Sequence, residues 1–220
     1  MKTKKFFLVL MLLGLTLNAF GQSIGISATY NMAKFKHIYD GEVMPDEDFI
    51  HYNSLSSFGF TFNYDMELKE NLFGEFGISY VQKGLKEVVE GEGYEGNDNL
   101  YENFKISYLQ FPLYIRYNFP AGDNMRFFGF GGLDIGMALG GKYIRDDGHD
   151  KEETDLKFGS AASNHFKSMD MGFTLGGGML YNNFELRLGY NMGMSNISTD
   201  SDEVIKNRVF FIGFGYRFNL

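Results

Sequence analysis

The 220-residue chain contains no cysteine and only three prolines. Without cysteine there is no disulfide framework, no thiol nucleophile and no cysteine-ligated metal cluster. Beyond residue 21 there is also no apolar run of the roughly 20 residues that a transmembrane helix needs. What the chain has instead is 28 glycines, 24 phenylalanines and 14 tyrosines, a composition typical of aromatic β-strands with bends marked by glycine.

The N-terminus carries the pattern of a secretory signal peptide. Three lysines among the first five residues precede an unbroken apolar run over 6–13, and Ala19 and Gly21 supply small residues where a signal peptidase needs them. The apolar run is too short to cross about 30 Å of hydrocarbon as an anchor helix. We therefore expect residues 1–21 to be a cleaved signal peptide and residues 22–220 to form a single exported domain.

Basic residues are scarce once that segment is removed. The remaining chain has 17 lysines and arginines against 28 aspartates and glutamates, a net charge of −11. An acidic surface of this kind argues against nucleic acid as a partner, because phosphate backbones bind basic surfaces.

Apolar and polar residues alternate with a period of two over 58–68, which is the pattern of a β-strand with one apolar face. A second strand follows the turn-prone residues 69–71 and keeps the alternation over 72–80. The same pattern recurs along the whole chain. The eight predicted strands cover 23–34, 58–68, 72–80, 104–119, 125–139, 166–179, 184–195 and 207–220.

The connections between these strands alternate in length. Those at 39–54, 86–102, 141–165 and 196–206 are long and polar, and those between them have only a few residues. An even number of up-and-down strands with short turns at one end and long loops at the other is the layout of an outer-membrane barrel. We therefore predict an all-β fold, an eight-stranded antiparallel up-and-down transmembrane β-barrel with short periplasmic turns and long acidic extracellular loops.

Two local features refine this prediction. Pro112 lies within the fourth strand and cannot donate a ladder hydrogen bond, so we expect a β-bulge there. Tyrosines near the strand ends fit two aromatic girdles at the membrane interfaces. The predicted girdle residues are Tyr64, Tyr117 and Tyr216 near the short turns, and Tyr80, Tyr108 and Tyr190 nearer the long loops.

The face opposite the apolar one carries charges of both signs. A soluble barrel of the lipocalin type would need an apolar interior, so these charges favour lipid outside the barrel and a polar lumen inside it. Eight strands leave a lumen only wide enough for side chains, so we expect a charge network that plugs it. Its predicted members are Asp65, Glu67, Glu75, Arg116, Arg126, Asp134, Asp170, Glu185, Arg187 and Arg217, with Lys83 on the same face. Those expected to pair near the short turns are Glu75, Asp134 and Glu185 with Arg116, Arg126 and Arg187.

No motif for chemistry stands out, so we expect no catalytic, cofactor-binding or metal site. Acidic stretches at 146–150 and 200–203 offer oxygen ligands but do not match a calcium-binding loop. The glycines at 176–178 lack the lysine and helix of a phosphate loop. The four histidines are interpreted as solvated loop residues rather than bases or ligands. They are His37, His51, His149 and His165.

Several short segments resemble the PorT-like outer-membrane β-barrel family of Gram-negative bacteria. They include Tyr108 to Leu113 (YLQFPL), Gly131 to Gly136 (GGLDIG), the hairpin segments around Gly176 to Gly178 and Leu186 to Tyr190, and the terminal Gly215 to Phe218. The resemblance covers most of the mature chain and implies a barrel inserted into outer-membrane lipid by the outer-membrane assembly machinery through the C-terminal strand. One branch of that family is associated with protein secretion and gliding, but the shared residues belong to the barrel, and a fold does not define a function.

The expected function is that of a non-enzymatic integral outer-membrane protein, a structural, binding or envelope-complex component with a plugged lumen. Two alternatives remain open. One is a narrow porin-like channel, and the other is a rim acyltransferase or other lipid-modifying enzyme that uses a loop histidine with a nearby Asp or Ser. Possible partners are envelope or secretion-complex proteins.

Overall fold

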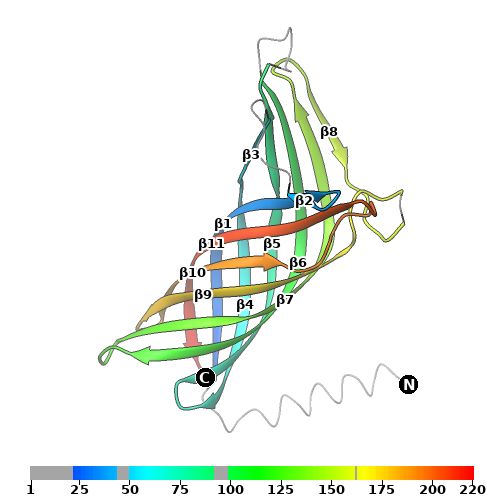
Figure 1. Ribbon diagram of the computed structural model, residues 1–220. Helices are drawn as coiled ribbons and strands as arrows, with labels where there is room; N and C mark the ends of the chain where they lie inside the picture. Colours follow the sequence, from blue (N-terminus) through cyan, green and yellow to red (C-terminus); the bar gives the residue numbers. More distant parts are fainter. Residues whose placement is uncertain (1–21, 44–49, 92–98, 162) are drawn as a thin grey trace, which may run out of the picture.

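The computed structural model describes residues 22–43, 50–91, 99–161 and 163–220, and within them the fold is all-β (Figure 1). The expected signal peptide over 1–21 lies outside the described residues. No helix in the described part of the chain is long and apolar enough to cross a membrane. The strands are β1 (Gln22–Tyr39), β2 (Glu42–Val43), β3 (Ile50–Asn53), β4 (Leu55–Lys69), β5 (Leu72–Val89), β6 (Leu100–Pro120), β7 (Met125–Asp146), β8 (Lys151–Asp155), β9 (Met169–Tyr181), β10 (Phe184–Gly193) and β11 (Glu203–Asn219).

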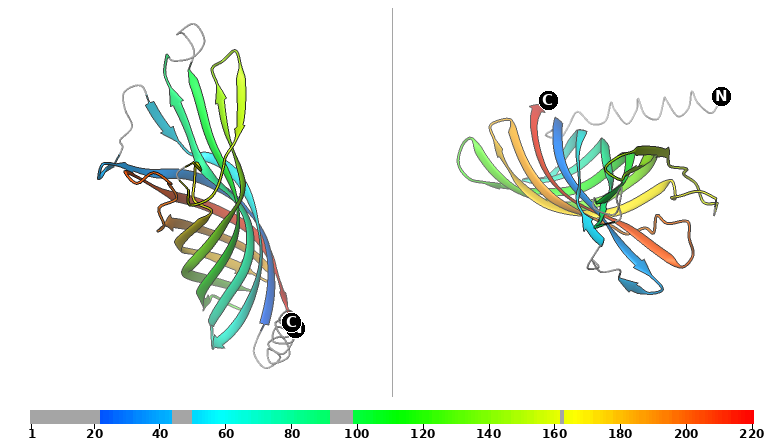
Figure 2. Two further views of the ribbon diagram at one scale, coloured as in Figure 1. Left: turned by 90° about the vertical axis from the view of Figure 1, so that its right-hand side faces the viewer. Right: turned by 90° about the horizontal axis from the view of Figure 1, so that it is seen from above.

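Eight of these strands form one closed ring of antiparallel neighbours in the order β11-β10-β9-β7-β6-β5-β4-β1. The ring closes where β11 pairs with β1, in one unbroken register from Ser23 opposite Asn219 to Tyr39 opposite Glu203. The left view of Figure 2 shows the strands slanting side by side along the wall of the ring. The predicted eight-stranded up-and-down barrel is therefore confirmed.

The strands extend well beyond the predicted segments at the long-loop end. β5, β6 and β7 stay paired up to Val89, Leu100 and Asp146, and β3 and β8 add to their edges. In Figures 1 and 2 these strands rise as a tall flank above the rest of the ring. The predicted connections at 39–54, 86–102 and 141–165 were therefore too long, because parts of each are strand. Both faces of the flank are polar or mixed, so the alternation disappears from the sequence while the backbone ladder continues.

The two faces of the ring differ as predicted. Outward residues in the lower part are apolar and exposed, such as Phe58 at 66% and Leu175 at 61%, and this surface fits contact with lipid hydrocarbon. Inward residues are polar and buried. Tyr108 departs from the predicted girdle, because it is completely buried and faces inward, in step with Gln110 on the same strand. The outward apolar run of β5 ends at Tyr80, so the flank lies above the lipid-facing band.

Pro112 causes no bulge. The pairing between β5 and β6 has the same register before and after the proline, from Phe76 opposite Leu113 to Ser79 opposite Gln110. A Cβ on Gly77 would come 2.9 Å from the Pro112 ring, so the glycine makes room for proline without a register shift. The observed irregularity of β6 against β7 lies instead between Ser107 and Tyr108.

Candidate functional site

Six charged side chains from five strands meet inside the barrel near the short-turn end. Arg187 on β10 donates two hydrogen bonds to Glu75 on β5, at 2.9 and 3.0 Å, and a third to Glu185 at 2.6 Å. Arg116 on β6 lies 3.1 Å from Asp65 and 3.5 Å from Glu185. The sixth member, described below, completes a set that we call the charge layer, made up of Asp65, Glu75, Arg116, Glu185, Arg187 and Arg217.

Arg217 on β11 contacts all three carboxylates of the charge layer. Its guanidinium lies 3.1 Å from Glu75 and also pairs with Asp65 and Glu185. Three guanidinium groups therefore balance three carboxylates, and every member is almost completely buried. Burial of charges is tolerated only when they are compensated, and every member of the charge layer has at least one oppositely charged partner.

Four other predicted members of the network lie elsewhere. Glu67 and Arg126 are only half buried and line a cavity of about 240 Å³ at the short-turn end, and neither forms an ion pair with another described residue. Asp134 and Asp170 are buried higher in the lumen, each with its own partners. The pairing expected for Asp134 and Arg126 with the other charges near the short turns is thus not found.

Asp134 is held by neutral donors instead of an arginine. Gln110 and Tyr114 on β6 donate to it at 2.5 and 2.7 Å, and Asn191 on β10 donates at 2.8 Å. Thr174 on β9 donates a further short hydrogen bond to the same carboxylate. Four strands are tied together through this single side chain.

Aromatic rings separate Asp134 from the charge layer. Phe128 and Phe130 on β7 pack with Tyr114 inside the barrel, and the Arg187 guanidinium lies 4.9 Å from the Phe130 ring. A Cβ on Gly176 would come 2.5 Å from that ring. The glycines of β9 thus leave room for inward phenylalanines, since a Cβ on Gly178 would likewise come 2.5 Å from the Phe128 ring.

Above this level Lys83 and Asp170 form a second buried ion pair, 2.9 Å apart. Asn207 also donates to Asp170 at 2.9 Å, and the Lys83 ammonium lies 5.3 Å from the ring centre of Tyr108. Apolar side chains then fill the space above the pair. This apolar cluster comprises Val81, Ile106, Tyr108, Leu156, Phe166, Ile197 and Ile205.

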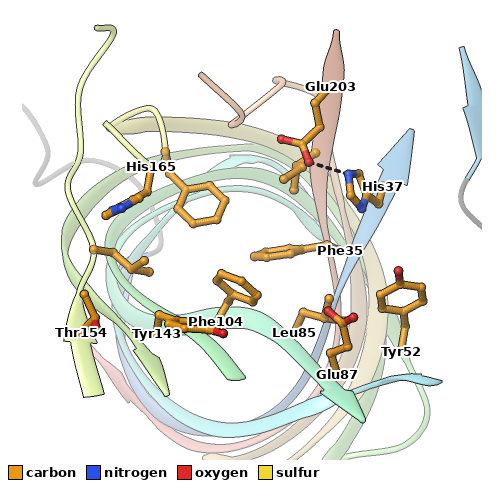
Figure 3. A pocket seen from close by; sticks show the side chains of 13 residues that line it. Phe35, His37, Tyr52, Leu85, Glu87, Phe104, Tyr143, Thr154, His165 and Glu203 are labelled. Carbon is orange, nitrogen blue, oxygen red and sulfur yellow. Dashed lines mark ion pairs between the residues drawn. The ribbon is translucent and has the colours of Figure 1, made fainter. Parts of the chain in front are cut away.

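The apolar cluster forms the floor of a pocket of about 500 Å³ at the long-loop mouth (Figure 3). Phe35 on β1, Phe104 on β6, Tyr143 on β7 and Phe166 contribute aromatic rings to its wall. Their centroids lie 5.0 to 6.5 Å apart, from Phe104–Tyr143 to Phe35–Phe104. The pocket has the size and apolar lining of a small-molecule site.

Polar groups of the pocket lie at its rim. His37 Nε2 is 2.6 Å from Glu203, as Figure 3 shows with a dashed line. Burial raises the pKa of Glu87, and the nearby Glu102 carboxylate raises it further, while His37 offsets part of the effect. Burial and a hydrogen bond to Glu102 raise the pKa of Tyr143 to about 12. The rim is therefore rich in carboxylates.

The four histidines are not gathered at one centre. His37 and His165 line the pocket, whereas His51 pairs with Glu90 at 3.3 Å. His165 Nδ1 accepts the Lys157 N–H at 2.9 Å, so that nitrogen is already occupied. His149 lies exposed in the turn after β7.

Carboxylates of both acidic stretches accept backbone N–H groups of their own turns, as Asp200 does from Asp202 at 3.0 Å. Asp146 accepts the Gly148 N–H at 3.1 Å, and Asp147 accepts two backbone N–H groups of the same turn, which lower its pKa. Among the described residues, no group of three or more His, Asp or Glu is placed to hold a metal ion.

The sequence reasoning missed the pocket, although strand parity contained part of the signal. Phe35 and His37 share the inward face with the odd-numbered residues of β1, and Phe104 shares that of Tyr108 and Gln110. The direction of Tyr143 could not be predicted in this way. The register of β7 against β6 shifts between Ser107 and Tyr108, and the shift changes which residues of β7 face inward beyond that point.

Comparison with known proteins gives a family and structural neighbours. Residues 18–199 match the family described as outer membrane protein beta-barrel domain. Solved structures that are similar include Ail, the attachment invasion locus protein of Yersinia pestis (16% identity, 90% of this chain and 99% of that chain, TM-score 0.38). OprG of Pseudomonas aeruginosa is 16% identical, with 92% of this chain and 97% of that chain covered and a TM-score of 0.40. Neisserial surface protein A is 11% identical, with 90% of this chain and 97% of that chain covered and a TM-score of 0.40. No curated protein matches the chain.

The family match spans most of the chain and agrees with the closed ring and its apolar outer surface. The predicted location is thereby confirmed. The chain belongs to the outer membrane protein β-barrel domain family and resides in the outer membrane of a Gram-negative bacterium.

Proposed function

We propose that this protein is a non-enzymatic barrel whose lumen is plugged and whose long-loop mouth, facing outward from the cell, binds a small apolar ligand. The observation that carries the proposal is the position of the 500 Å³ pocket directly above the buried apolar cluster. A ligand can enter from the mouth, but filled space lies beneath it. The pocket is thus closed at its lower end and is not part of a channel through the barrel.

Four successive levels of side chains support a plugged lumen. The charge layer joins β5 to β10, strands on opposite sides of the ring. Asp134 with its four donors lies above it, followed by the Lys83–Asp170 pair and the apolar cluster. Ion passage would require breaking buried, paired charges at several successive levels, which is costly.

The order of groups at the rim supports a role without catalysis. Ser198 Oγ donates to Glu203 at 2.6 Å, and Glu203 in turn contacts His37. In a nucleophilic triad the histidine lies between the hydroxyl and the carboxylate, because it must take the proton of the hydroxyl. Here the carboxylate lies in the middle, and Ser198 is buried.

Two measurements test this function. In planar lipid bilayers, the refolded barrel should give no steady ion conductance, and discrete open steps would contradict a plugged lumen. For binding, methyl NMR of the barrel in phosphatidylcholine nanodiscs is titrated with hexan-1-ol. The methyls of Leu85, Leu156 and Ile205 line the pocket and should shift with saturation, while the lipid-facing Leu68 and Leu186 serve as internal controls. Absence of any selective shift would refute the binding role.

Membership in the PorT-like family and association with an envelope complex belong to the same proposal. They are supported by the residues of β6 around Pro112 and by the tall flank, which offers a protruding surface. Pull-down of the tagged barrel in mild detergent tests this part. Recovery of the barrel alone would favour a free-standing membrane protein.

A further inference from the structure

The wall of the mouth pocket combines aromatic rings with carboxylates. Rings of Phe35, Phe104 and Tyr143 converge on one space (Figure 3), and Phe166 and Tyr52 of β3 also line it. The face of an aromatic ring carries negative partial charge and attracts organic cations, above all quaternary ammonium groups surrounded by several rings. The lining is therefore suited to more than a neutral hydrocarbon.

Apart from His37 and His165, the ionisable side chains that line the pocket are acidic or phenolic. Its lining contains Glu87 and Glu203, with no lysine or arginine among the described residues that line it. Glu203 is already engaged by His37 and Ser198. Glu87 forms no ion pair with another described residue, and its half-buried carboxylate has Glu102 as a like-charged neighbour. A cation placed beside Glu87 would relieve this repulsion.

We propose that the pocket binds an amphiphilic organic monocation, with its ammonium group beside Glu87 and its hydrocarbon tail between the aromatic rings above the apolar cluster. This inference rests on the proposed binding role and specifies its ligand class. An anion with the same tail would meet two carboxylates, and a neutral alcohol would gain only burial of its tail. The pocket therefore discriminates by charge as well as by size.

The test uses three probes that share a six-carbon chain: hexyltrimethylammonium chloride, hexan-1-ol and sodium hexanesulfonate. Each is titrated against the barrel in phosphatidylcholine nanodiscs, whose zero net charge does not itself concentrate the cation. The shifts of the Leu85, Leu156 and Ile205 methyls report binding. We expect the ammonium to bind at least tenfold more tightly than hexan-1-ol and the sulfonate to bind more weakly than both.

Variants locate the preference. Glu87→Gln should reduce the preference for the ammonium over hexan-1-ol to about twofold or less, whereas Glu152→Gln, an exposed residue of β8 outside the pocket, should leave it unchanged. Phe104→Leu keeps an apolar side chain but removes a ring, and should weaken the ammonium more than the alcohol. The methyl spectrum of each variant shows whether it is folded.

The outcomes separate the two proposals. If hexan-1-ol binds as tightly as the ammonium, the cation inference is overturned and the apolar binding role stands. If the ammonium shifts the lipid-facing Leu68 and Leu186 methyls as much as those of the pocket, it merely enters the bilayer and the inference is again overturned. If none of the three probes causes a selective shift, both proposals fail.

Discussion

Arg187 reaches across the barrel to Glu75 and donates two parallel hydrogen bonds to its carboxylate, at 2.9 and 3.0 Å. The two residues lie on β10 and β5, which have three strands between them in either direction around the ring. A planar guanidinium matches a carboxylate in this two-pronged geometry better than any other cation. The pair thus acts as a strut that holds opposite walls of the barrel at a defined distance.

Removal of this strut should be costly. Arg187→Ala leaves Glu75 and Glu185 with two guanidinium groups instead of three and should lower the free energy of unfolding by about 3–5 kcal/mol. Urea titration of the refolded barrel measures this free energy of unfolding. Arg145→Ala, the same truncation at an exposed side chain of β7, and His149→Ala in the exposed turn should each change it by less than about 0.5 kcal/mol. Equal stability of Arg187→Ala and these controls would indicate a wet lumen.

As an ionised carboxylate, Asp134 can accept hydrogen bonds from all four of its donors. Asp134→Asn keeps the shape but turns one acceptor into an NH₂ donor, which then faces the donors of Gln110, Tyr114 or Asn191. We expect a loss of about 1–3 kcal/mol in unfolding free energy, since a buried polar group is left unsatisfied. The control is Asp123→Asn in the exposed short connection. Unchanged urea midpoints for both would show that Asp134 is already neutral in the folded barrel.

The fit between Gly176 and Phe130 gives a packing prediction. A Cβ at Gly176 would come 2.5 Å from the Phe130 ring and 2.5 Å from the Leu188 carbonyl oxygen, which belongs to the backbone and cannot move away freely. Gly176→Ala should therefore destabilise the barrel by about 1–3 kcal/mol. At Gly140 nothing lies within 4 Å of the added atom, so Gly140→Ala should be nearly neutral. The temperature at which gel mobility shifts to that of the unfolded chain compares the two.

Binding of the ammonium probe should weaken in acid. The pKa of Glu87 lies above its ordinary value of 4.5, so this carboxylate becomes neutral early as the pH falls. His37, His165, Glu102 and Glu203 are the other titratable groups around Glu87, and protonation of any of them adds positive charge or removes negative charge, so each acts in the same direction. We expect the affinity for hexyltrimethylammonium to fall between pH 7.5 and pH 5, while that for hexan-1-ol stays flat. An ammonium affinity that rises in acid would contradict the placement beside Glu87.

The alternation of residues sufficed to predict the ring and the inward direction of most charges. Lipid contact demands an apolar residue at every second position, so residues such as Asp65 and Arg217 can only face the lumen. This constraint operates only within the lipid-facing band. Above it the pattern weakens, and for that reason the extensions of β5, β6 and β7 were not predicted.

The partners inside the lumen could not be read from the sequence. The alternation of residues places both Asp134 and Glu75 on the inward face of the barrel wall. It does not show that Asp134 meets neutral donors and Glu75 meets arginines, because this depends on the height of each residue along the barrel and on the twist of the ring. The pocket at the long-loop mouth is even harder to predict from the sequence. It is assembled from β1, β6, β7 and segments between strands, and a one-residue irregularity beside Tyr108 decides that Tyr143 points inward.

Arg217 lies on β11, the last strand of the chain. The charge layer therefore receives its third guanidinium group only when this strand joins the barrel. Before β11 joins β1, the charge layer holds two guanidinium groups against three carboxylates. Docking of the final strand therefore balances the charge layer in the same event that closes the ring. A chain caught one strand short carries an unmatched negative charge at its centre, which makes the open ring a high-energy intermediate and the finished one cooperative.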